Sequence, residues 1–170
     1  NLNPESLRVS SAAVAKACIN DKINSVAFLM PAEVKDLASS QATAEGLVLG
    51  SYQFNEFKTT RDDISLLESA SIVGGDKKSI EKGSVIANSV CFARDLENRP
   101  GNIATPSHLA EHAKKIGKSS SVKVTIFERD KFTKMGMGAL AGVASGTEEP
   151  PKFIVIEYKE CMTICTNIAI

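Results

Sequence analysis

The feature that most constrains this chain is one long helical segment that ends at a turn. Residues 79–97 keep a helical pattern. Pro100, Gly101 and Asn102 then form a stop, because proline cannot join a helix interior and glycine and asparagine tolerate positive φ. The apolar residues fall on two nearly opposite sides of a helical wheel: Ile80, Gly83, Ile86, Ala87, Val90 and Ala93 on one side, and Val85, Phe92 and Leu96 on the other. A single core needs one apolar stripe, so two stripes predict burial between two bodies. A central helix of one ordinary domain is the alternative that periodicity leaves open.

Short apolar runs alternate with helical patterns on both sides of this segment. Helices are predicted over residues 4–19, 39–57, 106–116 and 129–134, and strands over residues 25–30, 71–73, 122–127 and 153–156. Asn3-Pro4 and Thr105-Pro106 each place a capping side chain before a proline, which favours a helix start. The nearly all-apolar run at 25–30 is typical of a strand covered on both faces, as in a parallel sheet. The alternation predicts the α/β class.

Composition excludes several functional classes. Hydrophobic residues make up 43% and charged residues 24% of the 170 residues, which is a globular composition and not a disordered one. Lys and Arg number 20, as do Asp and Glu, so no net field attracts nucleic acid or acidic lipid. No apolar run approaches the roughly 20 residues of a membrane-spanning helix. We therefore expect no nucleic-acid partner and no membrane association.

The cysteines and the start of the chain point to a cytoplasmic protein. Cys18, Cys91, Cys161 and Cys165 are widely placed, so we interpret them as reduced thiols and not as a disulfide framework. Cys161 and Cys165 have no neighbours that would complete a metal site. The opening residues lack the layout of a signal peptide.

Two ordered blocks carry a family resemblance. Residues 93–106 read Ala-Arg-Asp-Leu-Glu-Asn-Arg-Pro-Gly-Asn-Ile-Ala-Thr-Pro, and residues 135–146 read Met-Gly-Met-Gly-Ala-Leu-Ala-Gly-Val-Ala-Ser-Gly, followed by Pro-Pro-Lys-Phe-Ile-Val-Ile-Glu-Tyr at 150–158. Both blocks resemble consecutive segments of the leucine aminopeptidase (cytosol aminopeptidase) family. The resemblance extends, more weakly, back to about Ser6.

The resemblance implies a division of the chain. Residues 1–75 correspond to part of a macro-domain-like α/β/α N-terminal domain, with Gly74-Gly75 as a plausible hinge. Residues 76–159 correspond to a long linking helix and the first α/β units of the catalytic domain. Residues 160–170 are unlike the family. We therefore expect a truncated fragment that begins inside a domain.

The resemblance also implies an activity that these residues do not complete. The family removes N-terminal amino acids from peptides with two divalent ions (zinc, manganese or magnesium), and it forms hexamers. The metal-binding and catalytic blocks of the family, Val-Gly-Lys-Gly-x-x-Phe-Asp-Ser-Gly-Gly and Asn-Thr-Asp-Ala-Glu-Gly-Arg, do not occur here. We therefore assign no catalytic, metal or substrate-binding residue, expect no cofactor in this chain, and expect it to be inactive alone. A non-catalytic assembly or regulatory module that joins full-length aminopeptidase is the alternative.

Three motifs suggest other sites. His108-Leu109-Ala110-Glu111-His112 matches an inverted zinc-protease pattern, with His at i and i+4 on one helix face. We interpret it as solvent-exposed surface opposite an apolar stripe of Leu109, Ala113 and Ile116; an independent metalloprotein is the weaker alternative.

Around Glu45-Gly46 lies a structural stretch that ends at Tyr52, where Gly46 allows close helix approach. We assign Gly136, Gly138, Gly142 and Gly146 to tight turns and helix packing, because no phosphate-loop fingerprint is met.

Overall fold

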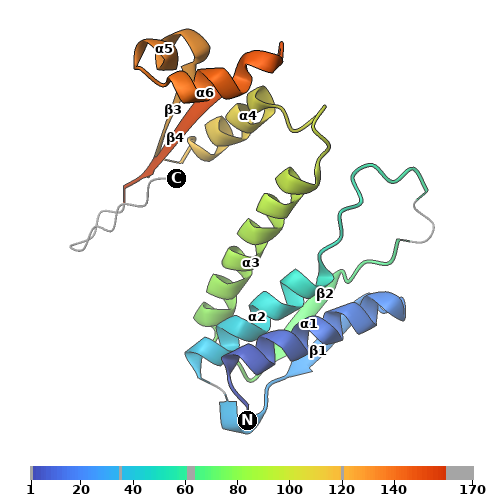
Figure 1. Ribbon diagram of the computed structural model, residues 1–170. Coiled ribbons are helices and arrows are strands. Elements are labelled where there is room, and N and C mark those ends of the chain that lie inside the picture. Colours follow the sequence, from blue (N-terminus) through green and yellow to red (C-terminus); the bar gives the residue numbers. More distant parts are fainter. Residues whose placement is uncertain (1, 35, 61–63, 120, 160–170) are drawn as a thin grey trace. The chain divides into compact units, whose positions relative to one another are not determined.

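The computed structural model describes residues 2–34, 36–60, 64–119 and 121–159, and its contacts divide the chain into two compact units, Asn1–Asn98 and Arg99–Ile170 (Figure 1). The first unit contains α1 (Pro4–Asn20), β1 (Ser25–Leu29), the 3-10 turn η1 (Ala32–Val34), α2 (Leu37–Ser51), β2 (Ser69–Val73) and α3 (Lys77–Asn98). The second contains α4 (Pro106–Ile116), β3 (Val122–Glu128), α5 (Arg129–Lys134), α6 (Gly138–Val143), η2 (Ala144–Gly146) and β4 (Lys152–Tyr158). The expected α/β class is confirmed.

Strands β1 and β2 of the first unit form a parallel pair. Their register aligns Ser25 with Ser69 and Leu29 with Val73. The expected parallel pairing is therefore confirmed, but coverage on both faces is wrong for this structure. Burial alternates along β1, and Leu29 is 72% exposed while the following Met30 is 2% exposed. The pair consequently presents one covered and one open face.

Helix α2 packs against both α1 and α3 through small residues (Figure 1). Its buried residues are Ser39, Ser40, Ala42, Thr43, Ala44, Glu45, Gly46, Leu47 and Gly50. A Cβ at Gly46 would collide with Ser11 Oγ and the carbonyl oxygen of Arg8, both on α1. On its other side, a Cβ at Gly83 of α3 would lie 2.5 Å from the Gln41 carbonyl oxygen. Close helix approach at Gly46 is thus confirmed, and the missing side chains permit both contacts.

Helix α2 ends earlier than its sequence pattern predicts. The helix stops at Ser51, and Tyr52 takes extended backbone angles of φ −62° and ψ 129°. The prediction of helix to residue 57 is therefore wrong. No proline or positive-φ glycine marks this end, and the side chain of Tyr52 contacts α3, as described below.

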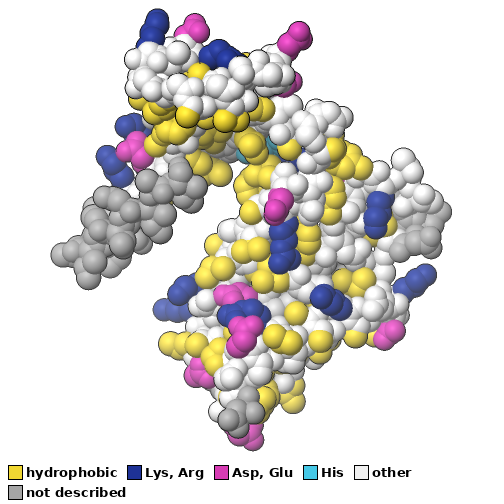
Figure 2. Space-filling view, in the orientation of Figure 1, with side chains coloured by type: hydrophobic (Ala, Val, Ile, Leu, Met, Phe, Trp, Pro, Cys, Tyr) yellow, Lys and Arg dark blue, Asp and Glu magenta, His cyan; other side chains and the backbone are white. Residues whose placement is uncertain are grey.

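Helix α3 buries only Gly83 and Ala87 of its apolar residues within the first unit, while Ile86 and Val90 of the same stripe are 39% and 38% exposed. Gly83 and Ala87, from the first stripe, are buried against α2. Val85 of the second stripe is 67% exposed and Phe92 is 39% exposed. Apolar side chains are visible in the α3 region of the surface (Figure 2). Burial of α3 between two bodies stays a prediction.

The second unit is built on an antiparallel strand pair. Strand β3 pairs with β4 from Val122↔Tyr158 to Glu128↔Lys152, and α4 packs on both strands. Thr105 caps α4, Pro106 is its first residue and Gly117 follows its end, as predicted. Of the predicted stripe, Ala113 is buried as expected at 4% exposed, but Leu109 and Ile116 are 39% and 41% exposed, and Ala110, which was not predicted, is 4% exposed. Phe132 of α5 is fully buried.

Candidate functional site

The two histidines of the sequence motif lie together on α4 and meet Arg99. The Nε2 atoms of His108 and His112 are 3.2 Å apart, and Arg99 Nη1 lies 3.3 Å from the first and 3.2 Å from the second. Both rings are half-buried, with centroids 4.5 Å apart in an edge arrangement. The expectation that both rings are solvent-exposed is therefore wrong, although Glu111 and Lys115 are exposed.

Local folding explains how Arg99, His108 and His112 come together. Positions i and i+4 of a helix share a face, which brings the two imidazoles side by side. The turn that follows Arg99 is closed by hydrogen bonds from the Ile103 and Ala104 amides to the Pro100 carbonyl oxygen, 2.8 and 2.9 Å long. This turn returns the chain to α4 directly after Arg99. The contribution of Arg99 was missed in the sequence, because nothing local predicts the direction of an arginine beside a proline turn.

The chemistry of this cluster follows from the donor that it contains. A guanidinium only donates hydrogen bonds, so each ring nitrogen that receives one must be unprotonated. Burial lowers the pKa of His112. The neighbouring His108, Lys115 and Arg99 lower this pKa further, and Glu111 raises it. The Nδ1 atom of His108 is buried and has no hydrogen-bond partner among the described residues. Burial and the neighbouring cations therefore favour a neutral ring at His112.

The metal centre implied by the family does not fit the described residues. Across residues 2–34, 36–60, 64–119 and 121–159, no group of three or more His, Cys, Asp or Glu is placed to hold an ion. The point where both histidine Nε2 atoms converge is next to a guanidinium. Cys161 and Cys165 lie outside the described residues. Cys18 and Cys91, which are described, are free thiols.

A second polar cluster joins α2 to α3. The Tyr52 hydroxyl donates to Asp95 Oδ1 at 2.8 Å and accepts from Asn98 Nδ2 at 3.1 Å. The Arg94 guanidinium lies over the Tyr52 ring, 5.5 Å from its centroid. Burial raises the pKa of the Tyr52 phenol. Arg94, Asp95 and Asn98 all belong to the block at 93–106, so this part of the motif has a structural role.

The stretch around Glu45 is also structural. Glu45 is 7% exposed. Its carboxylate accepts hydrogen bonds from Arg8 Nε at 2.8 Å and from Gln41 Nε2 at 2.7 Å. The hydrogen bond to Glu45 raises the pKa of the Arg8 guanidinium. Because Arg8 lies on α1 and Gln41 on α2, Glu45 joins those helices, in keeping with the structural role expected from the sequence.

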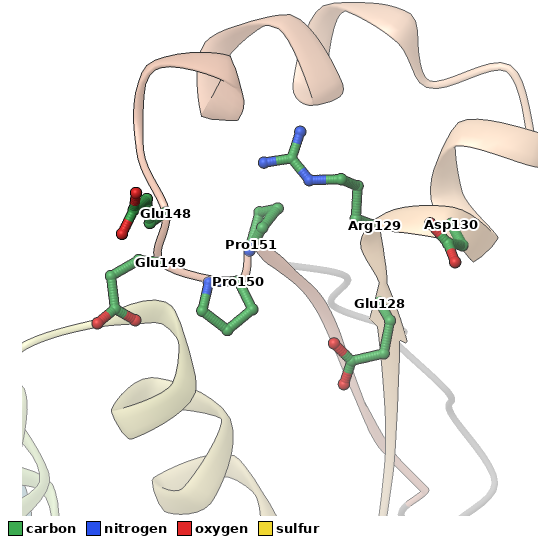
Figure 3. Close-up of a pocket in the computed structure, with 7 residues that line it drawn as sticks. All are labelled: Glu128, Arg129, Asp130, Glu148, Glu149, Pro150 and Pro151. Atoms are coloured by element: carbon green, nitrogen blue, oxygen red, sulfur yellow. The ribbon is translucent and has the colours of Figure 1, made fainter.

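A hollow of ≈ 330 Å³ lies in the second unit. Its lining residues are Glu128, Arg129, Asp130, Glu148, Glu149, Pro150 and Pro151 (Figure 3). The carboxylates of Glu128, Asp130 and Glu148 point in different directions (Figure 3), so they do not converge on one ion. Arg129 Nη2 donates to the Ala144 carbonyl oxygen at 2.8 Å and ties α5 to the segment after α6.

The glycine-rich segment before this hollow has a simpler geometry than expected. Gly136 has φ +83°, which confirms a turn there. A Cβ at Gly138, Gly142 or Gly146 would meet nothing within 4 Å, so helix packing is not the reason for these glycines. The structure offers no other reason for them.

Among the helices of the described residues, none is both long and apolar enough to cross a bilayer.

Comparison with known proteins places this geometry in context. Residues 1–61 match the model of the cytosol aminopeptidase family, N-terminal domain, and residues 91–170 match that of the cytosol aminopeptidase family, catalytic domain. A probable cytosol aminopeptidase of Geotalea uraniireducens is 37% identical over 169 residues, which cover 93% of this chain and 34% of the relative. One from Nostoc punctiforme is 39% identical over 162 residues, covering 93% and 33%. The chain thus spans about a third of the length of the curated relatives it matches.

Solved structures agree with the fold. A mutant tomato leucine aminopeptidase superposes with a TM-score of 0.80 at 34% identity, covering 96% of this chain and 35% of that chain. A bottromycin maturation enzyme in complex with manganese superposes with a TM-score of 0.81 at 22% identity, covering 95% and 34%. The second likeness concerns the fold alone. Both superpositions extend over nearly all of the chain.

Proposed function

This chain belongs to the cytosol aminopeptidase family, and from that membership we propose that it forms part of a metal-dependent aminopeptidase that removes N-terminal residues from peptides. The observation that carries the proposal is the order of the two matches, with an N-terminal domain followed by a catalytic domain on one chain. The chain spans about a third of its relatives, so the activity of the whole enzyme is what we propose and not an activity of these residues.

Within that enzyme, we assign these residues the scaffold and not the chemistry. Hydrolysis by two metal ions needs several carboxylates arranged around both ions. The family blocks that carry those ligands are absent from the sequence. The motif residues that are present have structural contacts: Asp95 and Asn98 hold Tyr52, and Glu45 holds Arg8. We therefore propose that the chain alone is inactive.

The remaining assignments also rest on the family. Residues 1–75 would supply part of a macro-like domain, and residues 76–159 the linking helix and the start of the catalytic domain. The ions of the whole enzyme would be zinc, manganese or magnesium, its substrates peptides, its assembly a hexamer and its compartment the cytoplasm. The relatives, which are probable cytosol aminopeptidases, support the activity and the compartment.

An assembly or regulatory role is the second candidate. Val85, on the side of α3 away from the buried Ala87, is 67% exposed. Apolar side chains on an open helix face favour a covering protein partner. Co-purification of the 170-residue chain with a full-length family member would favour this role, and its failure to associate would remove it.

An activity assay tests the first proposal. Purified chain should not hydrolyse leucine amide above background with zinc, manganese or magnesium added. An extended protein, in which the two missing blocks follow the residues of β4 and the N-terminal domain is complete, should hydrolyse it. Metal-dependent turnover by residues 1–170, retained after contaminating peptidases are removed, would contradict the proposal.

A further inference from the structure

Helix α3 continues further than its local chemistry favours. Its last turn carries the acids Asp95 and Glu97 and no basic residue, although the negative end of the helix dipole disfavours a carboxylate there. In the described part of the chain, the glycines with positive φ are Gly74 and Gly136, so α3 does not end at a left-handed glycine cap. An end of this kind is expected to fray. In the structure it nevertheless stays helical to Asn98.

The contact that opposes fraying comes from the end of α2. The Tyr52 hydroxyl donates to Asp95 Oδ1 at 2.8 Å and accepts from Asn98 Nδ2 at 3.1 Å. Because these two partners stand three positions apart, one oxygen atom bridges the whole last turn of α3. Hydrogen bonds to a carboxylate are stronger than those between neutral groups. Tyr52 and Asp95 are both half-buried, which limits competition from water for this bond.

We propose that Tyr52 is a clasp that sets the length of α3. With its hydroxyl bound to Asp95 and Asn98, the last turn is helical; without that contact, the turn unravels and lengthens the irregular segment of chain before α4. The proposal concerns a conformational device of the first unit and goes beyond the aminopeptidase assignment.

The earlier part of α3 is held differently and provides an internal reference. Gly83 and Ala87 are buried against α2, and a Cβ at Gly83 would lie 2.5 Å from the Gln41 carbonyl oxygen. At 1.5 Å per residue, Asp95 lies about 12 Å further along the helix axis than Ala87. Removal of the Tyr52 hydroxyl leaves the packing at Gly83 and Ala87 unchanged. The two parts of α3 should therefore respond differently to it.

Nuclear magnetic resonance of the 170-residue chain tests the clasp. The Cα chemical shifts of residues 95–98 report how much of the last turn is helical, and those of residues 83–87 are the reference. In Tyr52→Phe, the unravelled fraction of the last turn should rise about tenfold, the size expected for losing a hydrogen bond to a charged group. The reference shifts should stay helical. Chemical shifts of the folded state separate this local change from a general loss of stability.

Two alanine variants form a matched comparison. Glu97→Ala removes an exposed acid from the last turn, so higher helix propensity and the loss of an unfavourable charge should make that turn more helical. Asp95→Ala brings the same two gains but removes the partner of Tyr52, so the turn should become less helical. The proposal is overturned if the shifts of residues 95–98 do not change in Tyr52→Phe. It is equally overturned if the two alanine variants move those shifts in the same direction.

Discussion

The hydroxyl of Tyr52 donates a hydrogen bond to Asp95 across 43 residues of sequence, and this contact joins the end of α2 to the last turns of α3. The same oxygen accepts from Asn98, and Arg94 lies over the ring. Tyr52 ends the stretch at residues 45–52, and its partners lie at the start of the block at residues 93–106. The two motifs thus recognise each other inside the first unit.

Replacing this hydroxyl tests the contact. Tyr52→Phe should lower the free energy of unfolding by about 1 kcal/mol, because Asp95 and Asn98 lose a partner while the ring remains. Urea unfolding measures the change. Tyr158→Phe, at a tyrosine that is 56% exposed, is the matched control and should be nearly neutral. Equal effects of the two substitutions would contradict the role given to Tyr52.

Gly46 and Gly142 should respond oppositely to alanine. Gly46→Ala should destabilise by about 3 kcal/mol, the upper end for overpacking, because the new Cβ meets the backbone of α1 at Arg8. Gly142→Ala meets nothing within 4 Å and lies in α6, so it should be neutral or stabilising by up to about 1 kcal/mol. Thermal unfolding of both variants decides. A tolerated Gly46→Ala would mean that α1 and α2 are not packed as closely as described.

Helix α3 should tolerate change on one side and resist it on the other. Ala87 is fully buried against α2, so Ala87→Leu should cost about 1–3 kcal/mol through overpacking. Val85 is 67% exposed, so Val85→Ala should change the free energy of unfolding by less than about 0.5 kcal/mol. A large cost at Val85 would show that the open stripe is covered in solution.

Acid should weaken two helix starts. Hydrogen bonds from Ser39 lower the pKa of Asp36, and those from Ser79 lower the pKa of Asp76, each relative to 3.8. Their stabilising contribution is therefore complete above pH 3.8 and is lost as pH falls through the lowered values. Asparagine also caps helices but does not titrate. Asp36→Asn/Asp76→Asn should keep its stability at pH 7 and show a weaker loss below pH 4 than the unmodified chain.

An acid titration followed by circular dichroism measures that difference. Glu33→Gln, at an exposed acid with no cap contact among the described hydrogen bonds, is the control and should leave the acid transition unchanged. A transition in the double asparagine variant that matches the unmodified chain would exclude both carboxylates as its source.

Local signals predicted the parts of the fold that depend on local chemistry. The caps at Asn3 and Thr105, the proline that follows each, and Gly117 placed α1 and α4 correctly. The end of α2 was missed: Tyr52 is extended directly after it, and the hydroxyl of Tyr52 bonds Asp95 and Asn98, more than forty residues later. A helical pattern that continues past Ser51 contains no trace of that contact.

The histidine cluster shows a similar division. Spacing alone predicted that His108 and His112 share a face of α4. It did not predict which side of α4 faces the strands, because the small Ala110 carries less apolar signal than Leu109 although the two lie about 100° apart on the wheel. The strand pair selects the small Ala110 and Ala113, and Leu109 remains 39% exposed. Arg99 reaches the rings through a turn, and helical periodicity says nothing about turns.

Helix α2, made of small residues and held between α1 and α3, has a consequence for how the first unit comes apart. Removing either outer helix uncovers backbone and short side chains that offer water little apolar surface. The interface of α2 with each neighbouring helix is therefore stabilised more by close packing than by a large buried apolar surface. Added volume at the small buried positions of α2 should therefore be costly, so substitutions there should be confined to exchanges among Ala, Ser, Gly and Thr.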